Sequence, residues 1–273
     1  MAELSKIKFN MSKYAELFAE HGVDTSNTIS SDRDKFLKDR DARLERDAKR
    51  QQEWYLKQQK AIYQQYSLWP NGEPLHFEFK DWKPAKQPDA TEARKIGVKA
   101  FELSKQLVSK PFNVFLNGLP GVGKTSLALA LMAEADKRDL SIMFVSTTVW
   151  LSLYDQKYND ERVADKLRNV VRAMKEVDTL VLDDFGTEGG ALSRVQSAKS
   201  TGVRIDMQRD LYSIANARWN ADQNQPKGHT IVTSNNLQNE LERIYDTKII
   251  SRLIPQEKKY RIGFNKMTDV RGK

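Results

Sequence analysis

Residues 118–125 combine the residue types that bind the phosphates of a nucleotide. They read Gly-Leu-Pro-Gly-Val-Gly-Lys-Thr, which fits GxxxxGK[ST], and they lie between an apolar run at 113–116 and a run typical of a helix at 126–136. Glycines at this spacing let backbone N–H groups turn toward phosphates at a helix N-terminus, while Lys124 reaches the β- and γ-phosphates and the Thr125 hydroxyl binds Mg²⁺. The sequence therefore predicts a site for ATP and Mg²⁺. The predicted nucleotide-binding residues are Gly118, Pro120, Gly121, Val122, Gly123, Lys124, Thr125 and Ser126.

A second run, residues 179–186, predicts a buried strand that ends in two carboxylates. It reads Thr-Leu-Val-Leu-Asp-Asp-Phe-Gly. In a parallel sheet covered by helices, such a strand would deliver Asp183 to the water shell of a bound metal ion, and Asp184 could polarise an attacking water. Many buried strands end in Asp, so this run is informative mainly because it follows the phosphate-binding loop, residues 118–125.

Two further runs place polar side chains beside apolar ones. Residues 230–236 form a β-branched run that brings the Asn235 amide to the sheet edge where ligands of open α/β folds bind. Residues 249–254 are apolar except for Ser251 and Arg252. Arg252 is either a surface charge with a packed stem or a finger that reaches the γ-phosphate bound by a neighbouring subunit.

The order of these motifs resembles that of AAA+ ATPases, and within them that of DnaC/DnaI-type bacterial and phage helicase loaders. The resemblance covers roughly residues 75–265 and includes the segment 77–82, Phe-Glu-Phe-Lys-Asp-Trp, ahead of a predicted helix. It implies an α/β fold of the AAA+ P-loop NTPase type, in which a parallel sheet is flanked by helices and preceded by a small all-helical N-terminal domain. It also implies catalytic roles for Lys124, Asp184, Asn235 as sensor 1 and Arg252 as a trans-acting finger, with Thr125 and Asp183 at the metal.

The same resemblance implies an ATPase that loads a hexameric DnaB-type replicative helicase onto single-stranded DNA. ATP would drive self-assembly of the loader, and hydrolysis, stimulated by DNA, would release it. Most AAA+ proteins have Glu where this chain has Asp184, and the shorter carboxylate suggests slow hydrolysis. Three alternatives stay open: an IstB-type transposition ATPase that serves a transposase, a protein that holds ATP as a switch without turnover, and a small-molecule kinase.

Composition favours an intracellular protein with a polyanionic partner. The chain has 273 residues, a formal net charge of +8 and no cysteine, which excludes disulfides and thiolate metal sites. The three histidines, His21, His76 and His229, are too scattered for a zinc site, whereas DnaI-type loaders bear a zinc-binding N-terminal domain. No apolar run approaches the length of a membrane span and no signal-peptide core is present, so the expected location is the cytoplasm and no membrane partner is expected.

Three parts are expected along the chain: a helical helicase-binding domain at 1–68, a linker at 69–90 and the ATPase domain at 91–273. Residues 32–66 contain no Gly or Pro and carry dense charges of both signs, which predicts a long solvated helix or helix pair with a sparse apolar stripe. The alternative to helicase binding is a helical extension that packs on its own ATPase domain or self-associates.

Two segments are candidates for contact with DNA: the first combines aromatic and basic residues, and the second carries only basic charges past Glu188. One lies between the predicted strands at 141–146 and 179–183, and the other is the loop 187–204. The alternative for the first segment is that Trp150, Leu151 and Tyr154 are core residues at helical spacing. The candidate DNA contacts are Tyr154, Lys157, Arg162, Arg194, Lys199 and Arg204.

Overall fold

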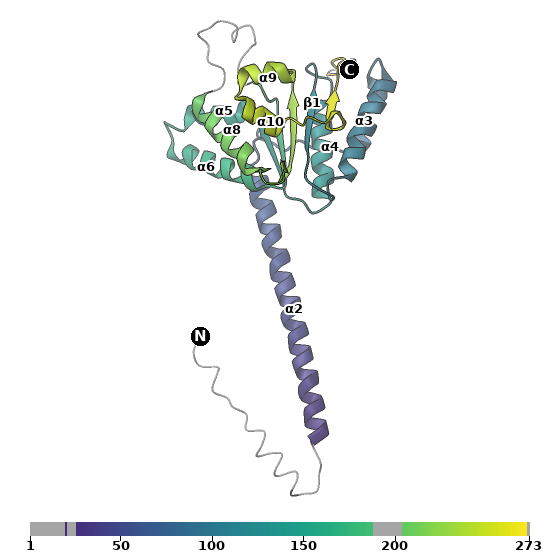
Figure 1. Cartoon of the computed structure of the whole chain (residues 1–273), viewed down its shortest axis with the longest axis vertical. Helices are drawn as coiled ribbons and strands as arrows, with labels where there is room; N and C mark the ends of the chain where they lie inside the picture. The colour runs from purple at the N-terminus through teal and green to yellow at the C-terminus, as the bar shows by residue number, and fades with distance from the viewer. Residues whose placement is uncertain (1–19, 21–25, 188–203, 272–273) are drawn as a thin grey trace. The chain divides into compact units, whose positions relative to one another are not determined.

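The structure is a computed structural model that describes residue 20, residues 26–187 and residues 204–271 (Figure 1). The chain forms two compact units, residues 1–58 and residues 59–273. Helix α2 (Ser26–Gln65) is 40 residues long and begins six residues before the long helix expected at 32–66. In the first unit, large apolar side chains of α2 are exposed: Phe36, Leu44, Trp54, Tyr55 and Leu56.

In the second unit, five of the described strands form one parallel sheet in the order β2-β3-β6-β1-β7. The strands are β1 (Asn113–Asn117), β2 (Ile142–Ser146), β3 (Thr179–Asp183), β6 (His229–Ser234) and β7 (Arg261–Gly263). The short strands β4 (Trp219–Asn220) and β5 (Gln225–Pro226) form an antiparallel pair. Every residue of β2, β3 and β6 is buried, which explains why these strands are apolar and β-branched instead of alternating with polar residues.

Helices cover both faces of the sheet (Figure 1). The described α-helices of this unit after α2 are α3 (Ala90–Lys105), α4 (Lys124–Asp136), α5 (Thr147–Gln156), α6 (Glu161–Glu176), α8 (Ile205–Ala217), α9 (Gln238–Ile244) and α10 (Thr247–Leu253). Short 3-10 turns occupy Phe79–Asp81 (η1), Pro84–Lys86 (η2) and Lys258–Tyr260 (η4). Helices α3 and α4 pack against each other on one face, and α5, α6 and α8 form the layer on the other.

Alternate residues of each strand therefore enter different cores. In β1, Val114 and Leu116 join the core under α3 and α4, whereas Phe115 joins the core under α5, α6 and α8. Three of the described helices begin at an aspartate cap: Asp89 accepts a hydrogen bond from the Glu92 backbone N–H at the start of α3, and Asp160 and Asp246 cap α6 and α10 in the same way. The predicted AAA+ P-loop architecture, a parallel sheet flanked by helices, is confirmed.

The chain between α2 and α3 is attached to the sheet. Leu68 pairs with the edge strand β2, donating its N–H to the Phe144 carbonyl and accepting from the Ser146 N–H. Trp69 stacks on Phe144 with ring centroids 4.3 Å apart. The segment that follows α2 thus extends the sheet edge. None of the helices in the described ranges has both the length and the apolar character that a membrane span needs.

A buried arginine joins the amino end of the sheet to α6. Arg218 is 4 % exposed, and its guanidinium donates hydrogen bonds to the carbonyls of Met174, Val177 and His229 and to the Thr230 hydroxyl. Burial lowers the pKa of Arg218 to about 10, with a smaller opposing effect from Asp178, so the group is still charged at neutral pH. The guanidinium therefore bonds the last turn of α6 to β6.

Candidate nucleotide site

The sheet order brings three predicted motifs to one edge. Because β6 lies between β1 and β3, the segments that follow these three strands meet at their carboxyl ends. Lys124 is 5 % exposed, and its Nζ donates to the carbonyls of Gly118 (2.9 Å) and Leu119 (2.8 Å) and to Oδ1 of Asn235 (2.8 Å). The predicted loop lysine and sensor 1 amide are therefore in direct contact.

The surroundings of Lys124 favour a phosphate in place of the protein oxygens that its ammonium group contacts. Burial lowers the pKa of its ammonium group, while the carboxylates of Asp184 and Asp183 oppose that shift. An ammonium group has three N–H donors, and all three point at oxygens here. All three are neutral amide oxygens, so an anionic phosphate oxygen in place of a backbone carbonyl would give a stronger hydrogen bond in which both partners are charged.

Asp183 lies at the centre of a hydroxyl network. Its Oδ1 accepts hydrogen bonds from the Thr125 hydroxyl (2.9 Å) and from the Thr233 hydroxyl (2.7 Å). Burial raises the pKa of Asp183 to about 6, and the hydrogen bond from Thr233 is the largest effect that opposes it. Sequence reasoning did not assign Thr233 a role; its position two residues before Asn235, on the strand beside β3, was the available signal.

The backbone of Asp184 is fixed from two sides. It has a left-handed conformation with φ of 56°, which Asp tolerates better than most residues. Its N–H donates to the Thr233 hydroxyl (3.0 Å), and its carbonyl accepts from the Thr147 hydroxyl (3.0 Å). The half-buried Asp184 side chain is thus held at the carboxyl end of β3 by β6 and α5.

The oxygen atoms at this edge suit Mg²⁺ better than a softer metal. The Thr125 hydroxyl and the Asp183 carboxylate are hydrogen-bonded to each other, so one ion could reach both directly or through water. Mg²⁺ prefers such oxygen ligands and keeps several waters while it also binds substrate phosphates. Within the described residues, no three His, Cys, Asp or Glu side chains gather as a metal site, so nucleotide phosphates and water would complete the coordination.

Two loop glycines are required by close approaches as well as by backbone shape. Gly121 and Gly123 have φ of 76° and 101°, in the left-handed region that favours glycine. A Cβ atom on Gly123 would lie 2.7 Å from the Trp82 ring, and one on Gly121 would overlap the Asp269 carboxylate. Val122 is buried and Ser126 lies in the first turn of α4, while Pro120 is exposed.

Arg252 lies at the amino end of the strands, whereas the phosphate-binding loop of the same chain lies at their carboxyl end. Its backbone carbonyl accepts a hydrogen bond (2.6 Å) from the side chain of Asn113, the first residue of β1, whereas the loop follows the last residue of that strand. Four strand steps of about 3.3 Å separate these two ends. The guanidinium donates to the Lys248 carbonyl and lies 6.0 Å from the Tyr212 ring centroid. Arg252 therefore lies far from the phosphate-binding loop of its own chain.

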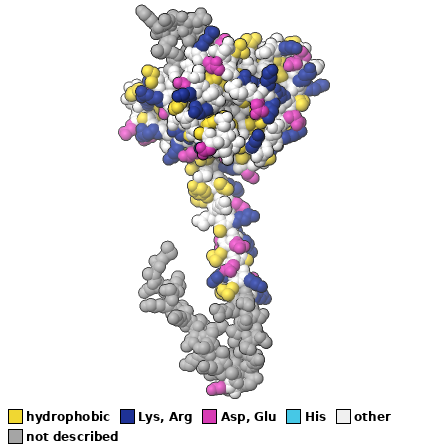
Figure 2. Space-filling model, viewed as in Figure 1, with side chains coloured by type: hydrophobic (Ala, Val, Ile, Leu, Met, Phe, Trp, Pro, Cys, Tyr) yellow, Lys and Arg dark blue, Asp and Glu magenta, His cyan; other side chains and the backbone are white. Residues whose placement is uncertain are grey.

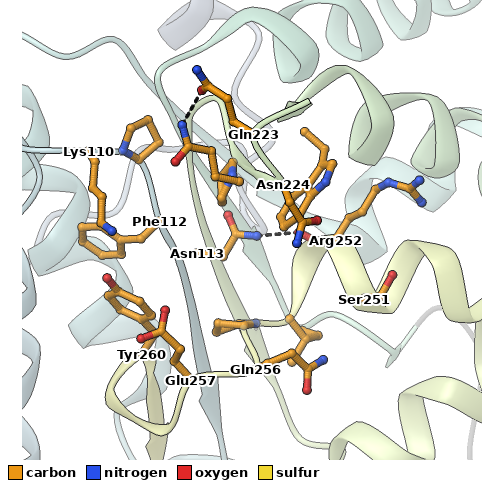
Figure 3. A pocket seen from close by; sticks show the side chains of 16 residues that line it. Lys110, Phe112, Asn113, Gln223, Asn224, Ser251, Arg252, Gln256, Glu257 and Tyr260 are labelled. Carbon is orange, nitrogen blue, oxygen red and sulfur yellow. Dashed lines mark hydrogen bonds between the residues drawn. The ribbon is translucent and has the colours of Figure 1, made fainter. Parts of the chain in front are cut away.

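A cavity of about 410 Å³ adjoins Arg252, and no residue of the phosphate-binding loop lines it. Figure 3 shows Phe112 and Tyr260 on one side of this cavity and the Arg252 side chain extending away from them on the other. The Phe112 and Tyr260 rings stack with centroids 5.0 Å apart. The cavity is thus separate from the nucleotide site.

The structure corrects part of the predicted DNA surface. Tyr154 is fully buried and donates to the Asp210 carboxylate, so it is a core residue and its ring cannot stack on a base. Burial alone would raise the pKa of Asp206, but hydrogen bonds from Lys157 and Arg204 lower it to about 2, so both candidate cations are already paired.

Of the three remaining candidate DNA contacts, the structure describes only Arg162. Arg162 is exposed and pairs with Asp160. Arg194 and Lys199 lie outside the described residues, as does most of the predicted loop 187–204. Figure 2 shows Lys and Arg side chains spread over the face in view and interspersed with Asp and Glu.

The C-terminal segment (residues 264–271) lies across the phosphate-binding loop, which the sequence did not predict. The Phe264 N–H donates to the Asn117 carbonyl (2.8 Å), and the Val270 N–H donates to the Gly121 carbonyl (3.2 Å). Between these points, the buried side chain of Gln87 makes two 2.9 Å hydrogen bonds with the Thr268 backbone. No local pattern links this segment to a loop that precedes it by more than a hundred residues.

The phosphate-binding loop, the paired carboxylates and the order of the parallel strands together define a P-loop fold of the AAA+ type. Residues 73–199 match the family described as IstB-like ATP binding protein. No curated protein matches the chain.

Several solved structures resemble this chain at low identity. AMPPCP-bound DnaA from Aquifex aeolicus is 22% identical over 59% of this chain and 43% of its own, with a TM-score of 0.42. The DnaI structure is 22% identical over 65% of this chain and 85% of its own, and the DnaC helicase loader is 16% identical over 63% and 89%, each with a TM-score of 0.45. The match spans less than half the length of the DnaA chain.

Proposed function

We propose that this protein is an ATPase that loads a replicative DNA helicase onto single-stranded DNA. The observation that carries the ATPase part is the contact between Lys124 and Asn235 beside the Thr125–Asp183 pair, because it joins the phosphate-binding loop, the strand that ends in Asp183 and the run that ends in Asn235 in one site. The loader part rests on the order of the motifs and on the charged helix α2, which in loaders of this type corresponds to the part that binds a hexameric DnaB-type helicase.

In this proposal each residue has a separate task. Backbone N–H groups of the loop and the Lys124 ammonium bind the triphosphate, and bound Mg²⁺ would neutralise charge that develops on its oxygens. Asp184, held in place through its backbone, polarises the attacking water, while Asn235 fixes Lys124 and lies near the terminal phosphate. ATP binding assembles subunits on single-stranded DNA in the cytoplasm, and slow, DNA-stimulated hydrolysis releases the loader.

The position of Arg252 supports an assembly in which each subunit completes the site of its neighbour. We predict that Arg252→Ala leaves ATP binding by the isolated chain within about twofold of wild type and removes DNA-stimulated hydrolysis, a loss of about 10³-fold if it is a finger. Calorimetry with ATP and a phosphate-release assay with an oligonucleotide measure the two effects. The control is Arg243→Ala, which removes an arginine from the neighbouring helix α9. Loss of ATP binding in Arg252→Ala would contradict a role in trans.

A second function, a transposition ATPase of the IstB type, is favoured by the family match at residues 73–199. Light scattering coupled to size-exclusion chromatography separates the two functions. The chain is mixed with the replicative helicase of its host, with and without ATP and a single-stranded oligonucleotide. We expect a stable complex with the helicase that is lost when α2 residues 26–58 are deleted. ATP-dependent assembly on DNA with no helicase complex would instead favour the transposition ATPase.

A further inference from the structure

We propose that Thr233 is a positioning residue for ATP hydrolysis. Its hydroxyl ties Asp184, which polarises the attacking water in the proposed function, to Asp183, which holds the metal ion. This inference rests on the proposed function and adds a residue to which the sequence motifs gave no role. It begins from the place of Thr233 on β6, the strand that lies between β1 and β3.

The alternation of side chains along the strands puts Thr233 and Asp183 on the same face of the sheet. Two residues earlier, Ile231 of β6 and Val181 of β3 both join the core under α3 and α4. Side chains two residues apart on a strand share a face, so Thr233 and Asp183 point to the side that α4 covers. Thr125 lies in the first turn of α4. Polar side chains from three elements therefore meet where α4 begins.

The Thr233 hydroxyl acts once as a donor and once as an acceptor. It donates to Oδ1 of Asp183 (2.7 Å) and accepts from the Asp184 backbone N–H (3.0 Å). A hydroxyl has one proton, so its donation to the carboxylate leaves a lone pair for the N–H. The Thr233 backbone carbonyl also accepts from the Phe185 N–H (2.9 Å). One residue thus bonds three successive residues at the end of β3.

The position of Asp184 depends on such contacts because its backbone leaves the strand conformation. Its φ of 56° is left-handed, which is unfavourable for residues other than glycine and persists only where the surroundings hold it. Lys124, which binds phosphate in the proposed function, is held by other partners. Loss of the Thr233 hydroxyl should therefore affect hydrolysis much more than ATP binding.

Packing of the strand does not require a hydroxyl at position 233. Thr233 is 0 % exposed, and a buried hydroxyl destabilises a fold unless it is hydrogen-bonded. Valine has nearly the same shape without the hydroxyl, and the preceding residue of the same buried strand is Val232. What the hydroxyl contributes is thus the link between the two aspartates.

Thr233→Val tests the proposal, because it removes the hydroxyl and keeps the shape. We expect the single-turnover rate of hydrolysis of bound Mg²⁺-ATP, measured with an oligonucleotide present, to fall about 100-fold. Calorimetry should show an affinity for Mg²⁺-ATP within about threefold of wild type, because chemistry and not binding is affected. Thr233→Ser, which keeps the hydroxyl, should recover most of the lost rate.

The same substitution in an Asp184→Asn background tests how the effect is transmitted. Asp184→Asn removes the carboxylate that Thr233 is proposed to position. Adding Thr233→Val should then lower the remaining rate by less than about threefold, since the two residues act as a unit. The full loss in this background would show that Thr233 acts by another route and would overturn the proposal.

Thr179→Val is the matched control. Thr179 is a buried residue of β3 whose hydroxyl has no hydrogen-bond partner within the described residues. This variant should hydrolyse ATP like wild type, and melting curves should show all variants folded. If Thr233→Val does not fold, Thr233→Ser and Thr233→Ala give the same comparison, since both lack the methyl group and only alanine also lacks the hydroxyl.

Two results would refute the positioning role: an unchanged rate in folded Thr233→Val, or equal rates in the serine and alanine variants at position 233. Failure of the wild-type chain to bind or hydrolyse ATP would instead refute the proposed function itself.

Discussion

Lys124→Ala is expected to abolish ATP binding. The ammonium group is the only side-chain cation predicted to reach the β- and γ-phosphates from the loop, and it is buried beside the point where they would lie. Two charge-assisted hydrogen bonds to phosphate are together worth about 3 kcal/mol or more, which corresponds to a loss of about 100-fold in affinity. Calorimetry with Mg²⁺-ATP at concentrations up to the millimolar range measures this loss.

The control for this variant is Lys137→Ala, which removes an exposed lysine just beyond the other end of α4. It should bind ATP like wild type. Because Lys124 also donates to Gly118, Leu119 and Asn235, its loss loosens the loop, and thermal melting is needed to show that the variant is folded. A folded Lys124→Ala variant with unchanged ATP affinity would show that the loop is not the nucleotide site.

Arg218→Met is expected to lower the free energy of unfolding by about 4 kcal/mol, more than any other substitution proposed for this protein. The guanidinium caps the last turn of α6 by donating to the Met174 and Val177 carbonyls, which have no partner further along the helix. Methionine fills the volume but donates no hydrogen bond, so these carbonyls and the Thr230 hydroxyl lose a buried donor. Chemical denaturation measures the free energy of unfolding.

Replacing a buried charge with an apolar side chain can be neutral when no polar group is left unpaired. Arg218 is not that case, because its partners are backbone atoms that the substitution leaves in place. The unfolding free energy of Arg218→Lys should lie between those of wild type and Arg218→Met, since lysine keeps the charge but has fewer hydrogen-bond donors. Arg209→Met, at an exposed position of α8, should change the unfolding free energy by less than about 0.5 kcal/mol. A loss below about 1 kcal/mol for Arg218→Met would refute the capping role.

The parts of the fold that could be predicted are those with a local signature. The phosphate-binding loop, the strand that ends in Asp183 and the β-branched run before Asn235 each follow from neighbouring residues. Their convergence could also be expected, because ligand sites of open parallel sheets lie at the carboxyl ends of the strands. The Lys124–Asn235 contact is a consequence of that topology.

Features that depend on packing between distant segments could not be predicted. For Tyr154 the sequence left open both stacking on a base and a core position at helical spacing; packing decides for the core, where the Asp210 carboxylate accepts a hydrogen bond from the Tyr154 hydroxyl. The sequence marks a boundary near 68 because Pro70 and Gly72 end the helix, whereas the compact unit begins at 59 because Tyr63 and Tyr66 pack against the core of the sheet. A helix-breaking residue marks the end of an element and not the edge of a domain.

Trp82 makes three positions of the chain depend on one another. Its indole N–H donates to the Ala93 carbonyl, and its ring lies against Gly97 of α3 and Gly123 of the loop, 2.6 Å and 2.7 Å from where their Cβ atoms would be. A methyl group at either glycine would displace the indole. A smaller side chain at position 82 would leave a gap against the loop, so the effects of substitutions at the three sites are not additive. Evolution at these positions is expected to proceed by joint replacement, with an alanine at 97 accompanied by a narrower ring or an aliphatic side chain at 82.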